Sequence, residues 1–135
     1  MRLPDWPERL ADMVAAWRQQ PFMWGEADCA LFAAAAVEAC RGHNPAAHWR
    51  GHYHSGRSAY RLLRTRGFQT LADAVDATLG PRLPPVLARR GDVVALARAA
   101  GLALGVCQGG VALFPAKGAG LEAVPMTEVF TAWRV

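Results

Sequence analysis

Residues 22–40 read FMWGEADCALFAAAAVEAC, a short apolar turn followed by a long run of helix-forming residues. The run from Cys29 to Cys40 is rich in alanine, which predicts a helix. Because it is apolar on almost every side, it is typical of a helix buried through the middle of a domain. Gly42 ends it, and Asp28 directly before it is suited to cap its free N–H groups. Cys29 is therefore expected at the first turn of a buried central helix.

Three more helices are predicted around this one. The first begins near Asp5, continues with apolar residues at helical spacing to Trp17, and stops at Pro21. The other two are residues 56–66 and residues 71–79, the latter capped by Thr70.

The pattern changes at Arg90-Gly91-Asp92, after which short apolar runs are separated by glycines. These runs predict strands, and Gly109-Gly110 predicts a hairpin turn between two of them. The predicted strands are 93–98, 102–108, 111–114, 121–124 and 131–135. The chain is expected to form one α+β domain over residues 1–135, mainly helical over 1–80 and mainly strands over 91–135.

Composition narrows the function classes. The net charge is +4, but nearly all the positive charge comes from arginines spread along the chain, so we expect no nucleic-acid partner. A small basic nucleic-acid-binding domain is kept as the third hypothesis, after the two functions given below. Three cysteines without zinc-ligand spacing predict neither a disulfide framework nor a metal site. We expect no signal peptide, no membrane association and no cofactor.

The position of Cys29 has two interpretations. At a helix start, free N–H groups and the helix dipole favour a thiolate, which is how a nucleophile is placed and activated. The alternative is a buried cysteine that behaves as a small apolar residue, as expected for Cys40. Asp28 likewise caps the helix or positions the nucleophile.

Several motifs carry a resemblance to the NlpC-like, papain-type cysteine peptidases. They are Phe22-x-Trp24-Gly25-x-x-Asp28-Cys29, Arg90-Gly91-Asp92-Val93-Val94 and Ala103-Leu104-Gly105-Val106. The chain is most similar to the small members encoded among the tail genes of tailed phages and gene transfer agents. Arg50-Gly51-x-Tyr53 and the segment 132–135 resemble features of that subgroup.

The chain departs from this family at the catalytic partners. Where active members have the general-base histidine, this chain has Ala103, and the third polar position corresponds to about Phe114. Alanine cannot accept the thiol proton or return it to a leaving amine. His52 and His54 lie in the loop after the central helix and are candidates for a replacement base. The same two histidines could also bind a metal ion, but no acidic residue or cysteine lies at the usual ligand spacing from them.

The resemblance implies a structural or assembly component of a phage-type tail tip or baseplate, built on a degenerate peptidase fold. Its partners would be other tail-tip or hub proteins. It would be made in the bacterial host cytoplasm and located in the virion tail. The alternative is an active cysteine hydrolase that cleaves peptidoglycan stem peptides during cell entry, with Cys29 as nucleophile.

Overall fold

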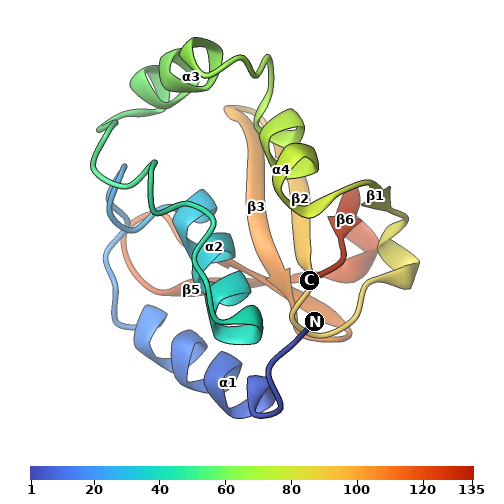
Figure 1. Cartoon of the computed structure of the whole chain (residues 1–135). Helices are drawn as coiled ribbons and strands as arrows, with labels where there is room; N and C mark the ends of the chain where they lie inside the picture. Colours follow the sequence, from blue (N-terminus) through green and yellow to red (C-terminus); the bar gives the residue numbers. More distant parts are fainter.

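The computed structural model describes residues 1–135 and places the helices before the sheet along the chain (Figure 1). The α+β architecture predicted from the sequence is confirmed. None of the helices is both long and apolar enough to cross a bilayer. The helices are α1 (Trp6–Trp17), α2 (Cys29–Arg41), α3 (Gly56–Thr65) and α4 (Leu71–Leu79). The strands are β1 (Arg82–Leu83), β2 (Val93–Arg98), β3 (Gly101–Cys107), β4 (Val111–Pro115), β5 (Leu121–Pro125) and β6 (Thr131–Trp133), with 3-10 turns η1 (Pro85–Leu87) and η2 (Met126–Glu128).

All strands pair antiparallel in one sheet of order β1-β6-β2-β3-β4-β5. The last strand, β6, therefore lies inside the sheet, between β1 and β2. β3 pairs with β2 along Gly101–Val106, but with β4 only at Val106 and Cys107. The upper part of β3 consequently has only β2 as a strand neighbour, and the two strands run side by side in Figure 1.

The central helix is buried as its sequence predicts. Phe32, Ala36 and Cys40 of α2 are fully buried, because α2 packs between α1 and the sheet. Small alanine side chains let this helix approach β3 closely. The core forms two clusters. The larger lies between the helices and the sheet, and the smaller, with Phe114 and Val94, lies on the opposite face of the sheet.

Both ends of the chain meet at one buried carboxylate. Asp92 is fully buried and accepts hydrogen bonds from the guanidinium groups of Arg2 and Arg134, each at 3.0 Å. It also accepts from the backbone N–H groups of Val135 at 2.9 Å and Arg89 at 2.8 Å. The N and C termini consequently lie side by side in Figure 1.

Candidate functional site

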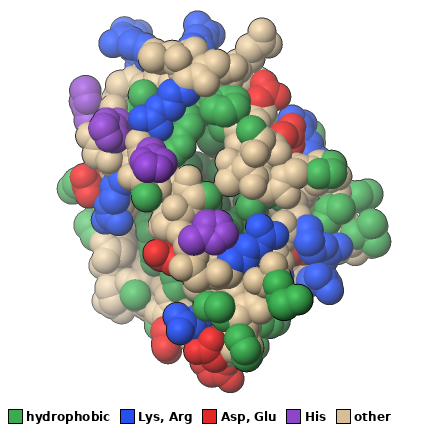
Figure 2. Space-filling view, viewed as in Figure 1, with side chains coloured by type: hydrophobic (Ala, Val, Ile, Leu, Met, Phe, Trp, Pro, Cys, Tyr) green, Lys and Arg blue, Asp and Glu red, His purple; other side chains and the backbone are tan.

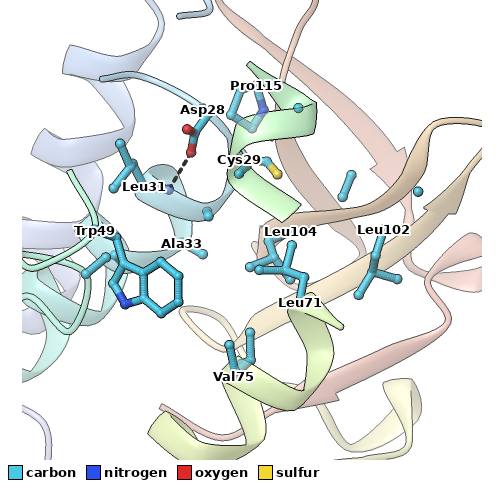
Figure 3. Close-up of a pocket in the computed structure, with 18 of the residues that line it drawn as sticks. Asp28, Cys29, Leu31, Ala33, Trp49, Leu71, Val75, Leu102, Leu104 and Pro115 are labelled. Atoms are coloured by element: carbon cyan, nitrogen blue, oxygen red, sulfur yellow. Dashed lines mark hydrogen bonds between the residues drawn. The ribbon is translucent and has the colours of Figure 1, made fainter. Parts of the chain in front are cut away.

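A tight turn and a capped helix place Cys29. The Asp28 carboxylate accepts one hydrogen bond from the N–H of Gly25 at 2.9 Å and another from the N–H of Leu31 at 3.0 Å. The second bond, drawn in Figure 3, is an N-cap, so the capping role predicted for Asp28 is confirmed. Gly25 has φ +80°, and a Cβ there would lie 2.0 Å from the carbonyl oxygen of Tyr53, so only glycine fits.

Tyr53 completes the support of this turn. Its hydroxyl donates to Asp28 Oδ2 at 2.5 Å, and both side chains are buried. Burial, followed by the Asp28 charge and the hydrogen bond to it, raises the pKa of Tyr53 far above its ordinary value. The sequence did not predict this contact. Its only signal is the Arg50-Gly51-x-Tyr53 segment, in which Tyr53 stands 25 positions after Asp28.

The Cys29 thiol is held in its protonated form. The pKa of Cys29 is raised to about 11, chiefly by burial and to a smaller extent by the negative charge of Asp28, although the nearby N–H groups of Leu104, Ala30 and Cys29 itself act to lower it. The helix start therefore does favour the thiolate, as predicted, but burial is the larger effect. Of the two interpretations of Cys29, this balance favours the buried, apolar cysteine.

Cys29 borders a large apolar cavity of about 710 Å³. Figure 2 shows it as a hollow beneath α3, bordered by hydrophobic side chains. In Figure 3 the sulfur points toward β3, with Leu102 and Leu104 on one side and Leu71 and Val75 of α4 on another. The volume lies within the usual range for small-molecule and peptide side-chain pockets.

The predicted replacement bases do not reach this cavity. His52 and His54 are exposed, although the tyrosine between them points inward to Asp28. No histidine lines the cavity, and no group of His, Cys, Asp and Glu side chains is arranged to hold a metal ion. The structure thus brings together Asp28, Cys29 and Tyr53, and leaves His52 and His54 outside.

The strand positions facing Cys29 differ from those that the resemblance indicates. Ala103 and Phe114 border the cavity, yet their side chains pack in the smaller cluster on the far face of the sheet. The β3 side chains on the α2 side are Leu102 and Leu104. Leu102 and Leu104 are apolar, as is Ala103 on the other face, so neither face of β3 supplies a proton acceptor to the thiol.

The arrangement provides an apolar cavity, and no free proton acceptor lies beside the thiol. A protonated thiol needs a base within hydrogen-bond reach, and the only carboxylate near it already accepts three hydrogen bonds. Compared with models of protein families, the whole chain, residues 1–135, matches the one described as "Domain of unknown function (DUF6950)". No curated protein matches the chain.

Proposed function

The chain belongs to the DUF6950 family, and we propose that it is a structural or assembly component of a phage-type tail tip or baseplate. In this proposal a peptidase-like fold serves as a docking module and has no catalytic role. The observation that carries the non-catalytic part is the cavity beside Cys29. It contains a thiol with a raised pKa, no histidine, and leucines at the strand positions facing the sulfur.

The assignment to a tail tip rests on the sequence. The turn before Cys29 and the Arg90-Gly91-Asp92 strand entry resemble the NlpC-like family, and Arg50-Gly51-x-Tyr53 and the segment 132–135 resemble its small tail-associated members. A virion component has neighbours in the particle, so its surface should carry interfaces. Fold and resemblance together supply this step by analogy.

An exposed apolar patch supports a docking role. Val86 is 87% exposed, and Leu87 and Phe130 are each more than half exposed. Val86 and Leu87 lie on the 3-10 turn η1, and Phe130 lies two residues after η2, which contacts η1. Apolar side chains gathered in this way are typical of surfaces that bind another protein.

Association with particles tests the proposal. The chain is produced with an affinity tag in a host that makes the phage-like particles, and the particles are purified by gradient centrifugation. We expect the chain to sediment with the particles and to remain bound after a salt wash. A Val86→Asp/Phe130→Asp variant with unchanged circular dichroism should sediment less with them. A chain that is absent from purified particles and runs as a monomer overturns the proposal.

The active cysteine hydrolase is the second candidate, and one observation favours it. Cys29 stands at a capped helix start, beside a cavity large enough for a peptide. Purified chain is incubated with peptidoglycan, with Cys29→Ala as control, and alkylation of Cys29 is followed against pH. We expect no digestion, and alkylation at neutral pH slower than that of a free thiol. Digestion that Cys29→Ala abolishes establishes the hydrolase instead.

A further inference from the structure

The upper part of β3 has backbone groups that no strand pairs. The N–H of Cys107 donates to Asp92 and its carbonyl accepts from Gly91, so the backbone groups of Cys107 point to the β2 side. In an antiparallel ladder the direction alternates from one residue to the next. The N–H and C=O groups of Leu102 and Leu104 therefore point to the other side, where β4 has diverged from β3.

This free edge borders the apolar cavity. Cys29 occupies its lower end, since the N–H of Leu104 lies beside the sulfur. Leu102 above it lines the cavity, and its outward N–H and C=O have no partner strand. Alanines of α2, among them Ala30 and Ala33, also line the cavity and leave room because their side chains are small.

The charges at the cavity are positive. Arg57 and Lys117 border it, are exposed, and form no ion pair. The other lining cation, Arg98, is paired with Glu122. The one lining carboxylate, Asp28, is buried and fully used within its turn. The entrance therefore favours a ligand with negative charge.

We infer that the cavity binds an extended peptide segment of a partner protein, with apolar side chains at alternate positions and an acidic residue beside them. This rests on the proposed docking function and names its ligand. The segment adds to the free edge of β3 by hydrogen bonds with Leu102. Alternate side chains enter the apolar cavity, and the acidic residue lies near Arg57 and Lys117.

The unpaired edge distinguishes this ligand from an acyl chain. A fatty acid with an anionic head would satisfy the apolar wall and the two cations, but it has no groups to pair with the backbone of Leu102. An extended peptide satisfies all three features of the site at once. Backbone pairing also tolerates sequence variation, because specificity then comes only from the alternate side chains.

Binding is tested with an immobilised library of acetylated hexapeptides. The peptides carry varied apolar residues at alternate positions and Glu, Ser or Lys at the flanks. We expect the wild-type chain to bind apolar members, with Glu-flanked peptides preferred about fivefold over Lys-flanked ones at low salt. The best binder is then resynthesised with N-methyl groups on alternate backbone nitrogens, and it should bind about five- to tenfold more weakly.

Variants locate the site. Ala30→Phe fills the cavity and should abolish binding of the best peptide, whereas Ala77→Phe, on the exposed side of α4, should leave it unchanged. If Ala30→Phe does not fold, the N-methylated peptide still tests the edge with unaltered protein. Equal binding of both peptide forms, no binding by any library member, or displacement of the peptide by laurate at lower concentration than unlabelled peptide overturns the inference.

The outcomes separate this inference from the proposed function. If the chain sediments with particles but binds no peptide, the docking function stands and the peptide site in the cavity is refuted. A chain that binds peptides through Leu102 but is absent from particles retains the peptide site and loses the tail-tip assignment.

Discussion

Replacing Tyr53 by phenylalanine removes one hydroxyl from the support of the Cys29 turn. The lost hydrogen bond runs to a carboxylate, at 2.5 Å, between two buried side chains. Hydrogen bonds to charged groups contribute about 1.5–3 kcal/mol, so Tyr53→Phe should lower the free energy of unfolding by about 2 kcal/mol. In a domain of this size that corresponds to a fall in Tm of roughly 5–10 °C.

The assay is urea unfolding followed by circular dichroism, with Tyr60→Phe as the matched control. Tyr60 is 39% exposed, and its hydroxyl forms no hydrogen bond. Its replacement should change the free energy of unfolding by less than about 0.5 kcal/mol. Equal effects of the two variants, or a Tyr53→Phe effect below about 0.5 kcal/mol, would show that Asp28 does not depend on the tyrosine.

Three further predictions follow from the same structure. The pKa of Cys29 is raised to about 11 in the folded chain, so the unfolded chain ionises first as pH rises, and this thiol should lower stability by up to about 2.7 kcal/mol between pH 9 and 11. Cys40, Cys107 and Tyr53 also have raised pKa values, so pH-dependent denaturation should find a smaller loss in Cys29→Ala, and an equal loss in the two chains contradicts the prediction. Asp92→Asn leaves two arginines without their buried carboxylate and should cost about 3 kcal/mol by urea unfolding; a cost below about 0.5 kcal/mol contradicts the role of this contact. Gly105→Ala places a Cβ 2.5 Å from the carbonyl oxygen of Leu113 and should lower the free energy of unfolding by about 3 kcal/mol. The control Gly110→Ala places a Cβ with no atom within 4 Å and should leave stability nearly unchanged, so equal Tm values for the two variants contradict this packing.

Helix and strand positions could be predicted from the sequence because local patterns determine them. The alanine-rich run after Asp28 and the stop at Gly42 mark α2, and Gly109-Gly110 marks the hairpin between β3 and β4. The two-residue strand β1 was not predicted. It exists only because Arg82 and Leu83 meet β6, about fifty positions later, and no local pattern encodes that meeting.

Of the site, the sequence predicted the part that local position determines. Asp28 and Cys29 are adjacent in the chain, and their roles at a helix start follow from position alone. The cavity depends on how far α4 and β3 stand from the small side chains of α2, a distance that only packing determines. The β3 side chains that face the sulfur were not predicted either. A short motif match placed the lost histidine at Ala103, while the strand register turns Leu102 and Leu104 toward the sulfur.

The position of β6 has a consequence for synthesis. A ribosome delivers residues 131–133 after the other five strands, yet they fill the gap between β1 and β2 and bring in Trp133, the largest fully buried side chain. Until then β2 has an open edge, and Asp92 lacks Arg134 and Val135. Contacts between distant parts of a chain also form slowly. The nascent chain therefore completes its sheet only when residues 131–135 become available, and a chain that stops before β6 leaves a central strand open to aggregation.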